Sequence, residues 1–293
     1  MGNAVALFKK YISLLDEVYK NASKSAVLDS NAANIANGAG ANEFIVPKIS
    51  MQGLADYSRN SGYVGGDVTL TNETVTFNYD RGRAFSVDAM DNEESAGIAF
   101  GKLASEFIRT KVVPEMDAFR FAQYAGTTGI SKVSAGATLS TGTEVIEALR
   151  AATTKMDEDE VPMENRILFI TPTLDGLIQD MDTTKSREVL SRFSQKILVP
   201  QSRFYTAITL YDGKTDTSST DSGVNQKVGG YVKATAGKDI NFMVIHKPAL
   251  LQYNGNIGRV PCEMWRCISE TVSVSGMARV SAVLSKICAI TAV

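Results

Sequence analysis

The segment DNEESAGIAFGKLASEFIRTKVVPEMDAFRFAQYAG, residues 91–126, carries the strongest structural signal in the sequence. Asp91 and Glu94 have the spacing of a capping box, and Gly126 supplies a C-terminal stop, so the segment predicts one long helix. Its apolar residues recur every three or four positions and form a narrow seam, which comprises Ala96, Phe100, Leu103, Phe107, Ala118, Phe121 and Ala125.

This predicted helix is long and contains one proline. At about 1.5 Å per residue it would measure about 50 Å, which is more than the width of a small domain. Pro114 removes one backbone donor and crowds the carbonyl of Thr110, so we expect a bend near Thr110. A helix of this length acts as a strut to which the rest of the chain attaches.

The sequence before the helix predicts strands and a projecting hairpin. The run NEFIVPKISM (42–51) and residues 74–79 are rich in β-branched and aromatic residues, while DYSRNSGYVGGDVTLTN (56–72) contains several turn-forming residues. We predict that 42–51 pairs with RGRAFSVD (81–88) and that the chain between them protrudes. Two strands alone cannot bury a hydrophobic face, so such a hairpin needs another subunit beneath it.

Five residues of this region are candidates for contacts between subunits: Tyr57, Arg59, Tyr63, Arg81 and Arg83. The guanidinium groups of Arg81 and Arg83 lie at the base of the predicted hairpin and could form bidentate pairs with carboxylates of a neighbour. The alternative is that they are ordinary solvated charges of an exposed strand.

The segments on either side of this core have different character. Residues 1–42 begin with a short amphipathic helix and become small and polar, which predicts an arm that docks on something else, such as a neighbouring copy. Residues 138–238 alternate helix and strand, with a capping box at Thr141 and Glu144, a buried strand at RILFI (166–170) and Pro172 in the first turn of a helix. This alternation predicts a compact α/β unit. The final strands, from INFMVIHK onward, are expected to pack on the long helix.

Composition excludes several classes of protein. The 293 residues are 44% hydrophobic, and 30 Lys plus Arg against 32 Asp plus Glu give a formal net charge of -2. Tight nucleic-acid binding needs a strong basic excess, which is absent here. No apolar run approaches the roughly 18 residues that span a bilayer, and charges interrupt the start of the chain, so we expect a soluble protein that is not exported.

The residues offer little for catalysis, metal binding or cofactor binding. Cys262, Cys267 and Cys288 match no zinc or redox spacing and are interpreted as buried thiols. The single histidine, His246, lies in an apolar run and is expected to be structural. The acidic run 157–160 has consecutive carboxylates, which cannot converge on one cation, and no phosphate-binding glycine motif occurs. We therefore predict no catalytic, metal or cofactor site, and no enzyme.

Several blocks of the chain resemble the major capsid proteins of tailed bacteriophages, which have the Hong Kong 97-type fold. They are residues 42–95, EFIRTKVVPEMDAFRFAQYAG (106–126), RILFITPTLDGL (166–177), VPQSRF (199–204) and INFMVIHKPAL (240–250), in this order along the chain. The resemblance implies an α+β fold with an N-terminal arm, an extended hairpin called the E-loop, a P-domain built on a long spine helix and an α/β A-domain.

The implied division of the chain follows these parts. The arm would be 1–42, the first strand and E-loop hairpin 43–85, the P-domain with the spine helix 86–137, the A-domain 138–238, and the returning P-domain strands 239–293.

The resemblance also implies a function and partners. Copies of the chain would form pentamers and hexamers that tile an icosahedral head around double-stranded DNA, together with a portal and a separate scaffold or decoration protein, in a virion assembled in the bacterial cytoplasm. An encapsulin-type nanocompartment shell of the same fold is the alternative, and an enzyme using His246 or the acidic run is a third hypothesis. Some relatives join subunits through an E-loop lysine, but no lysine occurs here between Lys48 and Lys102, so no covalent cross-linking is expected.

Overall fold

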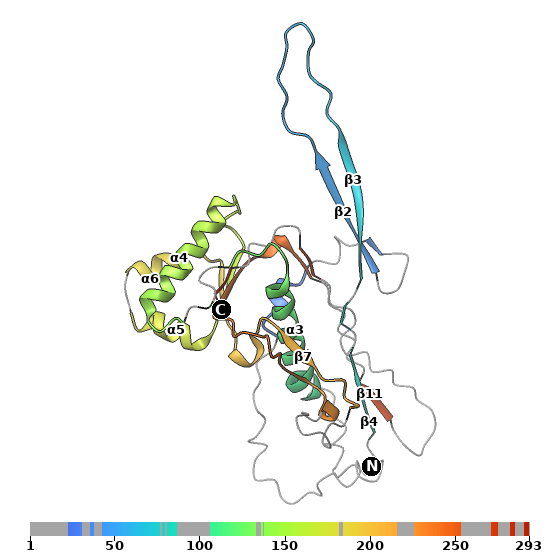
Figure 1. Cartoon of the computed structure of the whole chain (residues 1–293), viewed down its shortest axis with the longest axis vertical. Coiled ribbons are helices and arrows are strands. Elements are labelled where there is room, and N and C mark those ends of the chain that lie inside the picture. The colour runs from blue at the N-terminus through green and yellow to red at the C-terminus, as the bar shows by residue number, and fades with distance from the viewer. Residues whose placement is uncertain are drawn as a thin grey trace, which may run out of the picture.

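The computed structural model describes residues 23–30, 36–37, 43–76, 78–79, 81–86, 106–132, 136, 138–181, 184–215, 226–252, 271–274, 282–284 and 290–292. These residues form a body of helices and sheets from which one long hairpin projects (Figure 1). The predicted arm helix, the helical segment 91–105 and the three cysteines lie outside the described residues.

A four-stranded sheet organises the body, with strand order β13-β9-β5-β6. Strands β5 (Arg166–Ile170) and β6 (Gln195–Leu198) are parallel, whereas β9 (Phe242–His246) runs antiparallel to β5 and β13 (Ile290–Ala292) antiparallel to β9. Every residue of β5 is buried, as expected for a strand covered on both faces. β5 and β6 precede the expected boundary between the A-domain and the returning P-domain strands at 238/239, whereas β9 and β13 follow it. The sheet therefore includes strands from both predicted domains.

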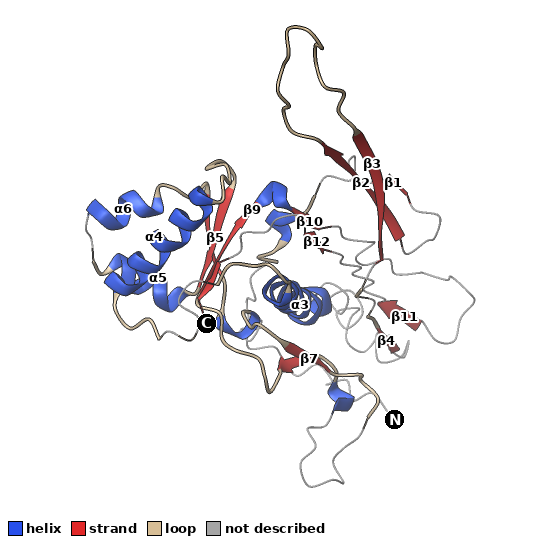
Figure 2. Cartoon of the chain, turned by 45° about the horizontal axis from the view of Figure 1, so that its top comes forward, coloured by secondary structure: helices blue, strands red, loops and turns tan. Residues whose placement is uncertain are grey.

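One face of the sheet packs against the helices α4 (Gly142–Glu158), α5 (Pro172–Gln179) and α6 (Thr184–Leu190), which lie together in Figure 2. The predicted capping box is present, because Thr141 accepts from the amide of Glu144 and the Glu144 side chain accepts from the Thr141 amide. Gly142 allows α4 to approach α5, since a Cβ at this position would lie 2.4 Å from the Leu177 carbonyl oxygen. Leu168 and Ile170 of β5 join this cluster.

The other face of the sheet packs against α3 (Val113–Gly126), the described C-terminal part of the predicted spine helix. The alternate β5 residues Ile167 and Phe169 point to this side, where Phe169 and Phe204 both meet Phe121 edge to face at centroid distances of 5.3 and 4.9 Å. The short 3₁₀ turns η1 (Ala26–Leu28) and η4 (Gln201–Arg203) also contribute to this cluster or contact α3.

The predicted helix departs from regular geometry where Pro114 was expected to disturb it. A π-helical turn, η3 (Ile108–Val112), precedes α3, and within it the Thr110 hydroxyl donates to the carbonyl of Glu106 at 2.8 Å. The helix ends at Gly126 as predicted. However, the seam is not narrow, because Pro114–Phe121 are buried all round, and Phe107 is only half-buried.

The strand pairing predicted for the hairpin is wrong. Strand β2 (Glu43–Met51) pairs with β3 (Val68–Thr76), whereas β4 (Arg83–Ser86), which was expected to take this place, pairs with β11 (Thr271–Val274). β3 lies closer to β2 along the chain, so it closes a smaller loop at a lower entropic cost, and it is much richer in β-branched residues than β4.

The remaining elements are short. The strands are β1 (Ala36–Asn37), which extends the β2–β3 sheet, β7 (Ile208–Leu210) with β8 (Tyr231–Lys233), and β10 (Leu250–Gln252) with β12 (Ala282–Leu284). The turns are η5 (Gln226–Val228) and η6 (Lys247–Ala249).

Candidate assembly surfaces

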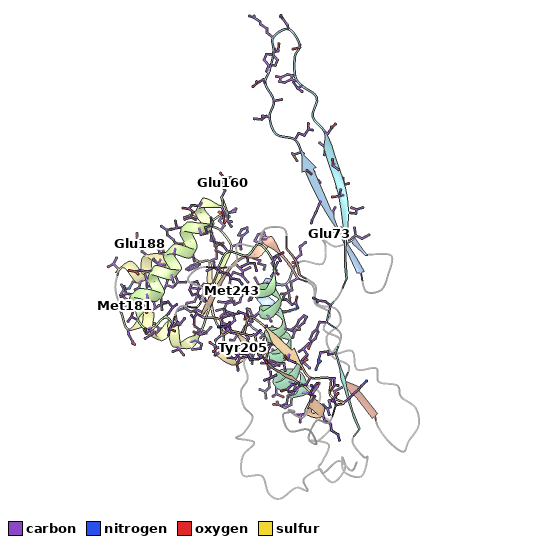
Figure 3. All side chains as sticks on the ribbon, in the orientation of Figure 1. Glu73, Glu160, Met181, Glu188, Tyr205 and Met243 are labelled. Carbon is purple, nitrogen blue, oxygen red and sulfur yellow. The ribbon has the colours of Figure 1, made fainter. Side chains whose placement is uncertain are left out.

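The projecting hairpin, residues 43–76, is the most exposed part of the described chain. Its strands are held by nine consecutive cross-strand pairs, from Glu43 with Thr76 to Met51 with Val68. Beyond them Gln52 continues the ladder, since its amide donates to the Asp67 carbonyl at 3.4 Å and its side chain accepts from the Asp67 amide at 3.3 Å. Figure 3 shows the hairpin side chains, from Glu73 to the tip, standing away from the body.

The two faces of the hairpin differ in polarity over its far half, residues 48–51 and 68–71. Directly paired residues share a face, so Ile49 lies beside Leu70 and Met51 beside Val68, and all four side chains are between 63% and 71% exposed. The opposite face carries Ser50, Thr69 and Thr71 together with an ion pair between Lys48 and Glu73. This far half is therefore amphipathic, and its apolar face has no cover from the described part of its own subunit.

The tip holds three of the predicted contact residues. The rings of Tyr57 and Tyr63 lie against each other at a centroid distance of 5.0 Å, and a mutual pair of backbone hydrogen bonds joins Ser58 to Gly62 beneath them. Gly62 has φ of +74°, which a residue with a Cβ adopts only with strain. Tyr57, Arg59 and Tyr63 are all exposed, so the structure leaves them accessible to a partner.

Arg81 and Arg83 are bound within their own chain. Arg81 Nε lies 2.6 Å from Glu115 Oε1 of α3, and its Nη2 donates to the Tyr211 carbonyl at 2.6 Å. Arg83 donates to the carbonyls of Val228 and Lys227 at 2.8 and 3.3 Å. These arginines therefore have intramolecular roles, and contacts of theirs with a neighbouring subunit stay a prediction.

Sequence reasoning missed a buried polar cluster centred on Asp117 of α3. The Asp117 carboxylate is fully buried and accepts from the hydroxyls of Ser23 and Ser25 at 2.6 and 2.7 Å and from the amide of Lys24 at 2.9 Å. Arg203 completes it with an ion pair of 3.1 Å. A charged residue within a helix is usually assigned to solvent, and Ser23 and Ser25 lie 94 and 92 residues away from Asp117 in the sequence, so no local signal indicated its burial.

Arg120, one turn along α3, extends this cluster to the C-terminal part of the chain. Its Nη1 donates to the Ser25 hydroxyl at 2.7 Å, and its Nη2 pairs with Asp29 at 3.2 Å. Gln252 of β10 donates to the Ser25 carbonyl at 3.1 Å, and Tyr124 donates to Gln252. Residues 23–30, which were expected to belong to a docking arm, are thus fastened inside their own subunit.

The residues considered for catalysis, His246 and the acidic run, make contacts that stabilise the fold. His246 ends β9 opposite Arg166, and partial burial together with the positive charge of Arg166 lowers its pKa. Asp157 of the acidic run pairs with buried Arg166 at 2.7 Å and with Arg192 at 3.4 Å. Within the described ranges no group of three or more His, Cys, Asp or Glu side chains could hold a metal ion. Among the same residues no helix is long and apolar enough to cross a membrane.

Comparison with known proteins shows similarity of structure without similarity of sequence. No protein-family model matches the chain, and neither does any curated protein. A solved structure of Mycobacterium phage Che8 superposes with a TM-score of 0.57 at 12% identity, covering 99% of this chain and 98% of that chain. The capsid structure of the cyanophage P-SCSP1u gives 0.56 at 14% identity, over 97% of this chain and 92% of that chain.

A third similar structure is a virus-like particle from Pyrococcus furiosus. Its TM-score is 0.50 at 10% identity, and the match covers 86% of each chain. All three similarities extend over most of both chains, so they concern the whole architecture rather than one shared motif. The chain therefore has the α+β fold of the phage major capsid proteins, as its resemblance to the Hong Kong 97-type proteins implies.

Proposed function

We propose that this chain is the major capsid protein of a tailed double-stranded DNA bacteriophage, and that it assembles into pentamers and hexamers of an icosahedral head. The observation that carries this proposal is the exposed apolar face of the hairpin. Ile49, Met51, Val68 and Leu70 are largely accessible to water within one subunit, although monomeric proteins rarely expose such a row of side chains. Burial of this face against another copy would supply free energy for assembly.

The fold and the charge of the chain support the same role. Structures of phage capsids match nearly the entire chain, and the hairpin projects from the body as a contact element would. A formal net charge of -2 suits a container that must enclose a polyanion without binding it tightly. A portal and a separate scaffold or decoration protein would complete the head, which would assemble in the cytoplasm of a bacterial host. The role is structural and not enzymatic.

The expected particle is a shell filled with DNA. Expression in the native host, followed by purification of particles and electron microscopy, should show icosahedral heads with tails. Nuclease treatment before extraction should leave a protected genome inside them. Particles that lack this chain, or heads in which it is a minor component, would refute the proposal.

A nanocompartment shell is the second candidate, because the virus-like particle from Pyrococcus furiosus has a similar fold. In that case native particles would be small, closed and tailless, and they would hold protein cargo instead of DNA. Mass spectrometry and the nucleic-acid content of the same particles distinguish the two functions.

A further inference from the structure

The base of the hairpin is attached to the body through a small set of contacts on the chain that leaves β3. Tyr79 is buried, its ring lies 4.8 Å from that of Phe119 on α3, and its hydroxyl donates to Glu115 at 2.9 Å. Burial, together with the negative charge of Glu115, raises the pKa of Tyr79 well above its usual range, so the phenol stays a donor. Glu115 accepts from Arg81 through the same oxygen.

The second half of this attachment joins the hairpin base to the turn that follows β7 and to the turn that precedes β8. Arg81 binds the Tyr211 carbonyl, and Arg83 binds the carbonyls of Lys227 and Val228. The Arg83 guanidinium packs closely on this turn, because a Cβ added at Gly229 would lie 3.0 Å from its Nη1. Gly229 has φ of +72°, so both its backbone and its lack of a side chain suit the bound arginine.

We propose that Tyr79, Arg81 and Arg83 form a clamp that fixes the direction in which the hairpin projects. The clamp fastens the base of the hairpin to two neighbouring elements of the body, helix α3 and the β7–β8 turns. Two attachment points fix the direction of the hairpin, whereas a single contact would let it rotate. The length of the hairpin amplifies any change of angle at its base. Nine residues at about 3.4 Å each give strands of about 30 Å, so a rotation of about 10° at the base moves their far end by about 5 Å.

The role of the clamp in assembly rests on the proposed function, because a shell subunit must present its hairpin at a fixed angle to reach the next copy. Arg81 and Arg83 are then positioning residues that act through the hairpin rather than through direct contact with a neighbour. Arginine suits this task because its planar fork binds two backbone carbonyls at once, whereas lysine provides a single ammonium group.

Electron spin resonance on isolated subunits tests the clamp directly. A keto amino acid at Asp56 on the hairpin and another at Thr154 on α4 would each carry a nitroxide, which leaves the native cysteines unlabelled. The distance distribution between the two labels should be narrow in the otherwise native chain and broad in Arg83→Ala. Arg83 is exposed, so this variant should fold normally.

Matched variants separate the clamp from general effects of charge. Arg59→Ala removes an arginine from the exposed tip and should leave the distribution narrow, while Arg83→Lys should broaden it despite keeping the charge. Tyr79→Phe keeps the ring against Phe119 but loses the bond to Glu115, and should broaden it as well. If the distance distribution stays narrow both in Arg83→Ala and in the double variant that combines Arg83→Ala with Tyr79→Phe, the proposal is overturned.

The outcome is independent of whether shells form, because the labels are measured within single subunits. Deletion of residues 58–68 tests the role of the hairpin in assembly separately. A failure of the clamp proposal can therefore be distinguished from a failure of the proposed role in assembly.

Discussion

Replacing Leu70 with aspartate should abolish shell assembly without unfolding the subunit. Leu70 is 63% exposed on the apolar face of the hairpin, beside Ile49. Full burial of a leucine side chain is worth about 1.5–3 kcal/mol, so covering the exposed part of Leu70 contributes about 1–2 kcal/mol per subunit. Forcing a carboxylate into the same contact adds a desolvation cost of at least about 2 kcal/mol. The sum of at least about 3–4 kcal/mol corresponds to an association weakened by at least about 100- to 1000-fold.

The neighbouring residue provides the control. Thr71 is also exposed but lies on the polar face, where it pairs with Lys48, so Thr71→Asp adds the same charge without touching the apolar contact. Light scattering during assembly and micrographs of the products should show shells for Thr71→Asp and none for Leu70→Asp. Thermal unfolding of the two subunits should agree within the few tenths of a kcal/mol typical of surface changes. Normal assembly of Leu70→Asp, or equal failure of both variants, would refute this reasoning.

Three further predictions concern stability and covalent chemistry. Asp117→Ala should lower the free energy of unfolding by about 3–5 kcal/mol in denaturant titration, because it removes the buried carboxylate that pairs with buried Arg203. Loss of the exposed Asp159–Lys155 pair should cost at most about 1 kcal/mol, and equal losses would contradict the assigned burial. The lowered pKa of His246 means that the unfolded chain binds the proton more readily, so its contribution to stability is present above pH 6.5 and is lost as the pH falls below that value. His246→Gln should therefore fall less steeply in stability between about pH 6.5 and 5 than the native chain, and identical slopes would count against this assignment. Subunits from particles boiled in denaturant should migrate as monomers, since the chain between Lys48 and Lys102 contains no lysine, and a ladder of higher species would show that cross-links form.

Local signals in the sequence predicted the elements whose stability is local. The capping box at Thr141 and Glu144, the buried strand 166–170 and the helix stop at Gly126 all appear where the residue pattern places them. Each depends on hydrogen bonds or periodicity within a few residues, which the sequence displays directly.

Long-range features could not be predicted in the same way. The expected pairing of 42–51 with 81–88 is wrong because several strand-forming segments compete for one partner. β4 pairs instead with β11, which lies far along the chain. The burial of Asp117 depends on Ser23 and Arg203, which are distant in sequence, so its solvation is invisible without the fold. Similarly, the partners of Arg81 and Arg83 come from α3 and the β7–β8 turns.

The central claim is that this chain exposes surfaces that other copies of itself cover. Sedimentation velocity on the purified chain, raised stepwise in concentration, measures this most directly. We predict a cooperative transition from small oligomers to one closed particle, which disappears when residues 58–68 are deleted. A single species of about 31.5 kDa at every concentration, with and without the deletion, would contradict the account.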